Sequence, residues 1–239
     1  MSPGKQIANI EFRLPLHGRI RTGIKGPKGW PESIKTFRFT SSDKQAIDQI
    51  AGVYGGTPKP WANGKDPEFE VITQSKDLNV ILPPDPLSGP TWEFWQKGGK
   101  LYDCDGVTCD VRVQGPDGPD WDEQPCLCEA NSKRVCKPTS RLKVLLPDVD
   151  LGGAWMLATG SFFAAVELPG MVQLVQMIHS ATLTPARLVL EARTAVKDGK
   201  TKHFNVPVLR TKSTIVELMS MNEMNGIGSE DLLELGEEA

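Results

Sequence analysis

The sequence predicts an α+β fold, mostly antiparallel β with a few helices and an inserted cysteine-rich, zinc-binding loop region. Three observations lead to this prediction. The 239 residues include 23 glycines and 19 prolines, a composition that favours many turns and short elements. Short runs alternate apolar and polar residues as strands do, and few stretches have helical spacing. All five cysteines fall in one part of the chain.

The chain is long enough to bury a substantial core. We expect residues 1–212 to form a single mixed domain. The zinc loop region would occupy about residues 101–139, and a helical, acidic tail would occupy residues 213–239.

A strand and a helix are predicted early in the chain. Residues 34–40 (IKTFRFT) alternate as a strand does. Residues 41–56 then have the apolar spacing of a helix, with Ser41 or Ser42 as its N-cap and a Gly-Gly pair to end it.

Further strands are predicted before the cysteines. Residues 69–75 (FEVITQS) and 78–84 (LNVILPP) look like strands a short step apart, as in a hairpin. Residues 91–106 predict two more strands around a Gly-Gly turn. Residues 113–125 (VQGPDGPDWDEQP) are rich in Pro, Gly and Asp, which predicts an exposed loop.

The second half of the chain continues the mixed pattern. Residues 141–149 and 153–160 predict strands. Residues 161–178 have the spacing of an amphipathic helix, in which Pro169 either produces a kink or begins a second helix. Residues 187–211 predict a long hairpin that turns at Asp198-Gly199.

Charge is unevenly distributed, although the formal net charge is only −3. Residues 1–40 contain eight basic and two acidic side chains, whereas residues 229–239 contain five acidic side chains and no basic one. This asymmetry indicates either electrostatic contacts with other macromolecules or two solvated ends.

No targeting or membrane signal is present in the sequence. The N-terminal residues lack an apolar run of signal-peptide length, and no run of about 18 apolar residues occurs. We therefore expect a cytosolic protein whose thiols stay reduced.

The cysteines predict a structural zinc site, because four thiolates can hold zinc tetrahedrally and close the loops that carry them. Their spacing is C-x4-C, then sixteen residues, then C-x-C-x7-C, which differs from the paired C-x2-C of common zinc ribbons. The alternative is a set of loosely buried free thiols. Five thiols for four places leave one spare, either Cys104 or Cys109; the other three are Cys126, Cys128 and Cys136.

No enzyme signature is found in the sequence. His17, His179 and His203 are scattered and match no zinc-enzyme pattern. The run GIKGPKGWP contains glycines but lacks the phosphate-binding G-x-x-x-x-G-K-[ST] pattern. We therefore predict a protein without catalytic residues, without a bound small-molecule cofactor and without a small-molecule substrate.

Residues 15–61 resemble the N-terminal block of a phage and actinobacterial family. Later hallmarks follow in order: CDGVT, PCLC with CKPTSRLKVLLPDV, GAWMLATGSFFAAVELPG and PARLVLEARTA. The resemblance runs from about Leu14 to about Leu209. This family is similar to the recombination directionality factors that partner large serine integrases of Streptomyces phages.

The resemblance implies a function in the cytoplasm of a bacterial host. Such a factor binds its integrase, activates attL × attR excision and inhibits attP × attB integration, while the integrase cuts the DNA. It would meet attachment-site DNA through the integrase complex. The position of Cys109 is often not cysteine in this family, which favours a zinc set of Cys104, Cys126, Cys128 and Cys136.

A partner surface is predicted in the basic N-terminal stretch, because exposed aromatic and Arg residues often dominate protein interfaces. This stretch would contact the integrase or its DNA, unless its tryptophan folds back onto the domain. Its residues are Arg19, Arg21, Lys25, Lys28 and Trp30. The alternative function is a zinc-containing, nucleic-acid-binding accessory protein of phage replication or repair, in which the same stretch grips phosphates.

Overall fold

The structure is a computed structural model in which most residues between 14 and 211 can be described. The described residues are 14–27, 29, 31–62, 67–115, 118–126, 128, 135–149, 153–179, 183–197 and 199–211. The predicted tail at 213–239 therefore lies outside them.

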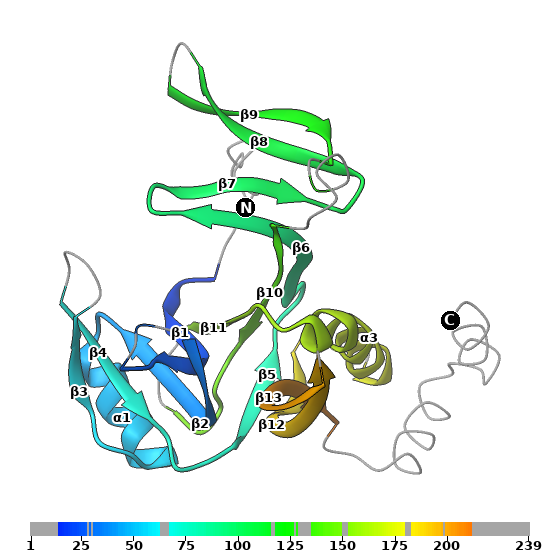
Figure 1. Cartoon of the computed structure of the whole chain (residues 1–239). Coiled ribbons are helices and arrows are strands. Elements are labelled where there is room, and N and C mark those ends of the chain that lie inside the picture. Colours follow the sequence, from blue (N-terminus) through cyan, green and yellow to red (C-terminus); the bar gives the residue numbers. More distant parts are fainter. Residues whose placement is uncertain are drawn as a thin grey trace, which may run out of the picture.

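The described residues form strands and two helices (Figure 1). The elements are β1 (Leu16–Lys25), β2 (Pro31–Ser41), α1 (Lys44–Tyr54), β3 (Lys59–Ala62), β4 (Pro67–Ile72), β5 (Asp77–Leu82), β6 (Leu87–Gln96), β7 (Gly99–Cys104), β8 (Thr108–Gly115), β9 (Gly118–Pro125), β10 (Lys137–Val144), β11 (Ala154–Thr159), α3 (Phe162–His179), β12 (Thr184–Lys197) and β13 (Lys200–Arg210).

Two sheets organise these strands. A ten-stranded sheet has the order β3-β4-β2-β1-β11-β10-β6-β7-β8-β9, and a three-stranded sheet has the order β13-β12-β5. Strands β1 and β11 pair in parallel, whereas the other described strand pairs are antiparallel. The predicted α+β class with mostly antiparallel strands is therefore confirmed.

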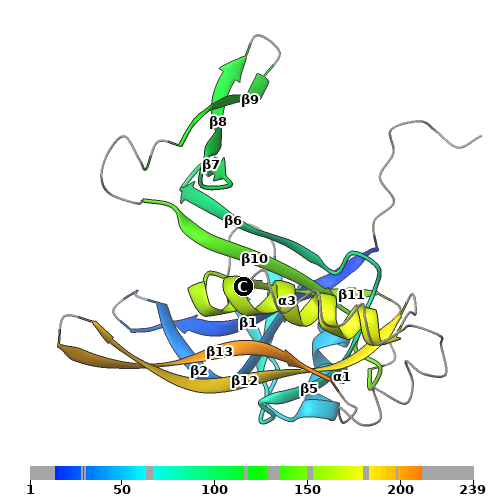
Figure 2. The same ribbon diagram turned by 90° about the vertical axis from the view of Figure 1, so that its right-hand side faces the viewer.

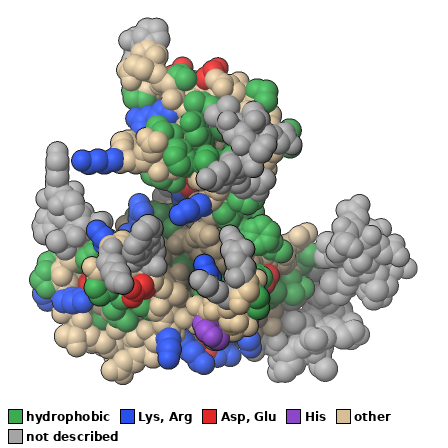
Figure 3. Space-filling model, viewed as in Figure 1, with side chains coloured by type: hydrophobic (Ala, Val, Ile, Leu, Met, Phe, Trp, Pro, Cys, Tyr) green, Lys and Arg blue, Asp and Glu red, His purple; other side chains and the backbone are tan. Residues whose placement is uncertain are grey.

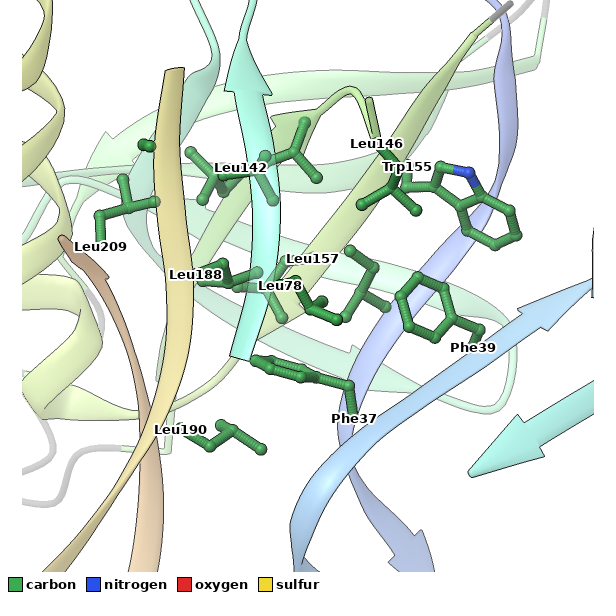
Figure 4. Close-up of a cluster of buried hydrophobic side chains, with 14 of the residues drawn as sticks. Phe37, Phe39, Leu78, Leu142, Leu146, Trp155, Leu157, Leu188, Leu190 and Leu209 are labelled. Carbon is green, nitrogen blue, oxygen red and sulfur yellow. The ribbon is translucent and has the colours of Figure 1, made fainter. Parts of the chain in front are cut away.

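The main hydrophobic core lies between the two sheets. Phe37 and Phe39 alternate with polar residues along β2 and are fully buried, and Phe39 meets Trp155 of β11 edge to face with ring centroids 5.1 Å apart. From the other sheet, Leu78 and Leu188 point into the same core (Figure 4). Burial of these side chains is the principal stabilising term for the body of the molecule.

The two helices cover the body. Helix α1 packs on β2 and β4, and α3 packs on β13, β6 and β10. Helix α3 continues through Pro169, so the structure has one helix here and no second helix begins. No helix in the described part of the chain is both long enough and apolar enough to cross a membrane.

Three local predictions are wrong. Strands β4 and β5 do not form a hairpin, because β4 joins the large sheet and β5 pairs with β12 in the small one. The N-cap of α1 is Asp43, whose carboxylate accepts hydrogen bonds from the N–H groups of Gln45 at 2.8 Å and Ala46 at 3.2 Å. Residues 113–125 lie mostly in strands β8 and β9, although their predicted exposure is found.

The cysteine-rich region is consequently more regular than an inserted loop. Strands β7, β8 and β9 extend the large sheet and stand clear of the body, as the two ribbon views show (Figures 1 and 2). We call β7, β8 and β9, together with the outer half of β6 from Trp92 to Gln96, the arm.

Candidate functional site

The arm is rooted in the body by a buried carboxylate. Glu93 of β6 is only 2% exposed, and both its oxygens accept hydrogen bonds from Arg141 of β10 at 2.8 Å. The indole of Trp95 donates to Glu93 at 2.8 Å, and the Lys100 ammonium lies 3.6 Å from it. Burial raises the pKa of Glu93, but the hydrogen bonds from Arg141 and Trp95 outweigh it and lower the pKa to about 2. Glu93 therefore stays ionised and ties the arm to β10.

All five cysteines gather on one face of the arm. Cys104 of β7 and Cys109 of β8 are directly opposite each other, and both are buried. Cys126, which follows β9, joins them in one buried cluster against which Cys128 packs. Cys136 is also buried, just before β10. Cysteines as far apart in the sequence as Cys104 and Cys136, which are separated by 32 positions, thus meet where the arm joins the body.

The sulfur atoms of the cluster differ in what they contact. The Sγ atoms of Cys128 and Cys136 are 3.7 Å apart. Cys104 Sγ accepts a hydrogen bond from the N–H of Gly106 at 3.3 Å, whereas Cys109 Sγ makes a weak 3.9 Å contact as donor to the Asp110 carbonyl. No group of three or more Cys, His, Asp or Glu side chains is placed to hold a metal ion within the described ranges.

The environments of the thiols differ. Burial raises the pKa of Cys104 and that of Cys136 to about 12. Hydrogen bonding from the Cys136 backbone N–H instead lowers the pKa of Cys128. The Cys128 thiol is thus more readily ionised than those of Cys104 and Cys136 when no cation is bound.

The predicted partner surface is placed only in part. Arg19, Arg21 and Lys25 lie on β1, an inner strand of the large sheet, and Arg19 and Lys25 are exposed. Lys28 and Trp30 lie outside the described residues, so their predicted role is neither supported nor contradicted.

The Arg21 side chain is half-buried and makes contacts within the protein that the sequence did not predict. Its guanidinium lies 5.1 Å from the ring centroid of Trp61, and its Nε donates to Thr40 Oγ1 at 3.2 Å. Arg38 stacks on the same ring at 4.4 Å and is ion-paired with buried Glu70. Burial, followed by repulsion from Arg19 and Arg38, lowers the pKa of Arg21. Arg21 therefore contributes to the packing of β1 as well as to the basic surface.

A groove of about 790 Å³ lies between β2 and the β12–β13 hairpin. Its lining includes Lys35, Lys76, His203 and Phe204. The described lining residues include no cysteine and no carboxylate that could serve with His203 as nucleophile or acid. Ser33 also lines the groove, and its hydroxyl oxygen accepts a hydrogen bond from the Asn205 backbone N–H at 3.3 Å.

Two tryptophans of the arm are exposed. Trp95 is 55% exposed and Trp121 is 46% exposed. Trp121 falls within residues 113–125, whose exposure was predicted, although it lies in strand β9 and not in a loop; the exposure of Trp95 was not predicted. The neighbours of Trp121 in PDWDEQ are a proline and polar residues. Since no apolar residue accompanies the tryptophan in this run, the sequence indicates that its side chain is exposed. In Figure 3 acidic side chains lie at the top of the arm, close to hydrophobic ones.

These features define an α+β protein with a basic β1, a projecting acidic arm and a cysteine cluster where the arm joins the body. The comparison with protein families matches residues 17–212 to the Gp3-like family, described as recombination directionality factor-like. The chain belongs to this family, as the sequence resemblance predicted. No curated protein and no solved structure matched the chain.

Proposed function

We propose that the protein is a phage recombination directionality factor that binds a large serine integrase in the cytoplasm of the bacterial host. It would activate attL × attR excision and inhibit attP × attB integration without catalysing either reaction. Its membership of the recombination directionality factor-like family over residues 17–212 is the observation that supports this proposal.

The mechanism is differential binding. A protein that binds one arrangement of integrase subunits more tightly than another shifts the equilibrium between them. A change from almost all integration to almost all excision requires a difference of about 5 kcal/mol. An extensive interface can supply this difference, whereas isolated surface ion pairs contribute at most about 1 kcal/mol each. A factor with a projecting arm and a separate basic strand has room for such an interface.

The basic strand β1 would supply one part of that interface. Arg19 and Lys25 are exposed there, and they would contact the integrase or the attachment-site DNA that the integrase holds. Arg21 would hold the strand in place through Trp61.

We also infer that the cysteine cluster holds one structural zinc ion through Cys104, Cys126, Cys128 and Cys136. In a tetrahedral site with Zn–S bonds of about 2.3 Å, two sulfurs lie about 3.8 Å apart. The 3.7 Å separation of Cys128 and Cys136 fits one edge of that tetrahedron. Binding would draw Cys104 and Cys126 to the same ion and join β7 and β9 to β10. Cys109 would remain a thiol, because its sulfur already serves as a weak donor to a carbonyl.

The central test uses the integrase encoded in the same genome. The purified factor should co-purify with it, stimulate attL × attR recombination and suppress attP × attB recombination. A gel shift on non-specific DNA without integrase separates this function from that of a nucleic-acid-binding accessory protein. Strong, steeply salt-dependent binding without any effect on recombination would favour the accessory protein.

A further inference from the structure

One face of the arm exposes the side chains of Asp110, Trp121 and Glu123 to solvent. Strands β7, β8 and β9 contact one another and β6, while the helices and the small sheet pack on the body. Figure 2 shows the arm standing above these layers. This face lies on the side opposite the cysteines, since Asp103 and Asp110 alternate with Cys104 and Cys109 along their strands.

Four carboxylates form a row across this face. The strand register places Glu93 opposite Asp103, Asp103 opposite Asp110, and Asp110 opposite Glu123. Lys100 and Arg141 neutralise the inner pair, Glu93 and Asp103. In the described part of the chain, Asp110 and Glu123 have no cation within ion-pair distance. Like charges directly opposite each other destabilise a sheet, so this outer pair does not serve the stability of the arm.

The same face carries both exposed tryptophans. Trp95 reaches Glu93 through its indole N–H, and the ring of Trp121 lies 5.5 Å from Lys100 Nζ. Together they flank the acidic row. Exposed tryptophan is uncommon on a surface that stays in water and frequent at protein interfaces.

Charge determines which partner suits this face. Strands β7, β8 and β9 carry five acidic and two basic side chains, and Arg112 already donates to the Gly98 carbonyl at 3.2 Å. Such a surface repels DNA. It attracts Arg and Lys side chains, because carboxylates pair with guanidinium groups and tryptophan rings bind cations.

The edge of the arm is a poor site for strand addition. Strand β9 has Pro119 and Pro125 near its ends and three carboxylates between them, and these features discourage pairing with a further strand. A partner is therefore expected to dock on the face of the arm.

We propose that the face formed by Trp95, Asp110, Trp121 and Glu123 docks on an Arg- and Lys-rich protein surface of the serine integrase. This inference rests on the proposed function and identifies a contact that is separate from β1. Ion pairs would provide orientation and rapid association, and the tryptophans would provide most of the affinity.

The test measures binding of the purified integrase from the same genome to the full-length factor at low and high salt. Asp110→Asn with Glu123→Gln should weaken binding at least tenfold at low salt and flatten its salt dependence. The melting temperature should stay equal or rise, because the like-charge repulsion is removed. Trp121→Ala should weaken binding at least tenfold at every salt concentration. Asp48→Asn with Asp85→Asn is the matched control, since it removes two carboxylates of the body, and it should bind as the parent does.

The outcomes separate the two proposals. If the parent binds and stimulates excision while the arm variants stay within twofold of it, the docking inference is wrong and the proposed function stands. If the parent neither binds nor stimulates, both are overturned. If the charge-neutral variant keeps its integrase affinity but gains affinity for duplex DNA, the acidic face serves to repel DNA, and the docking inference is again overturned.

Discussion

Glu93 links the arm to the body through a charge that depends on pH. Its pKa is lowered from 4.5 to about 2, so the folded protein holds the ionised form more tightly than the unfolded chain does. The stabilisation is fully present above about pH 5 and is lost as the pH falls from 4.5 towards 2.

Replacing this carboxylate tests the link. Glu93→Gln should lower the free energy of unfolding at pH 7 by about 2–3 kcal/mol, because it leaves Arg141 partly unpaired. The gap between parent and variant should shrink at pH 3, since only the parent loses charge stabilisation there. Denaturant unfolding at both pH values measures the gap. A gap that stays constant would contradict the assignment of the low pKa to Glu93.

The cysteines allow a test of the zinc ligands one residue at a time. The parent, purified without chelator, should contain about one zinc per chain by elemental analysis. Cys136→Ser should reduce the zinc content to a small fraction and loosen the arm, because three remaining thiolates leave the shell open. Cys109→Ser should keep its zinc and cost only about 1–2 kcal/mol for burying a hydroxyl.

Two results would change this assignment. A metal-free parent would mean that the cluster consists of buried free thiols. Loss of zinc in Cys109→Ser, with zinc retained in Cys104→Ser, would make Cys109 the ligand in place of Cys104.

At the scale of elements, replacing a glycine within a helix tests how much that helix contributes to the free energy of unfolding. An added Cβ at Gly52 of α1 or Gly170 of α3 would meet nothing within 4 Å. Gly52→Ala and Gly170→Ala should therefore each raise the free energy of unfolding by about 0.5–1 kcal/mol. Gly18→Ala is the contrasting variant, because its Cβ would collide with the Thr40 carbonyl and the Trp155 ring. Urea unfolding should show stabilisation for the first two and destabilisation for the third.

The sequence predicts elements best where burial on one face creates a period. The alternation around Phe37 and Phe39 and the spacing in α1 and α3 reflect such burial, and these elements are found. Strands β8 and β9 were missed because only Cys109 and Val111 of this hairpin join a small buried cluster, so it has no continuous apolar alternation. The wrong β4–β5 hairpin has another cause: periodicity indicates which face is buried and does not identify the neighbouring strand.

The candidate sites also have features that the sequence predicts and features that only the structure shows. Clustering along the chain was enough to predict that the cysteines meet, but the different hydrogen bonds of Cys104 and Cys109 became visible only in three dimensions. The acidic row joins residues 93, 103, 110 and 123, whose alignment depends on the register of four strands and on a bulge in β6. No spacing in the sequence encodes that register.

The whole molecule presents two surfaces of opposite charge on one continuous sheet. Strands β1 and β9 are six positions apart in the large sheet. At about 4.8 Å per strand, the path along the sheet from β1 to β9 is about 29 Å long. Residues so far apart contribute to binding independently. A partner that engages both surfaces must span the factor or offer two separate sites.

The contribution of the basic surface can be measured without disturbing the fold. Arg19 and Lys25 are exposed and have no carboxylate within ion-pair distance among the described residues, whereas Arg21 is tied to Trp61 and is unsuitable for the test. Arg19→Ala with Lys25→Ala should leave the melting temperature and the zinc content unchanged. It should reduce the stimulation of attL × attR recombination about three- to tenfold at limiting factor, as expected for two surface charge contacts.

Arg19→Ala with Lys25→Ala can be combined with the arm variant Asp110→Asn with Glu123→Gln in one chain. Because Asp110 on β8 and Glu123 on β9 lie about 24 and 29 Å from β1 along the sheet, the losses in free energy should add, and the fold-reductions in integrase binding should multiply. Lys44→Ala with Lys76→Ala removes two cations elsewhere and should leave binding and stimulation unchanged. If the combined variant is no weaker than the arm variant alone, β1 does not take part in the complex. The basic residues would then serve only the solubility and packing of the body.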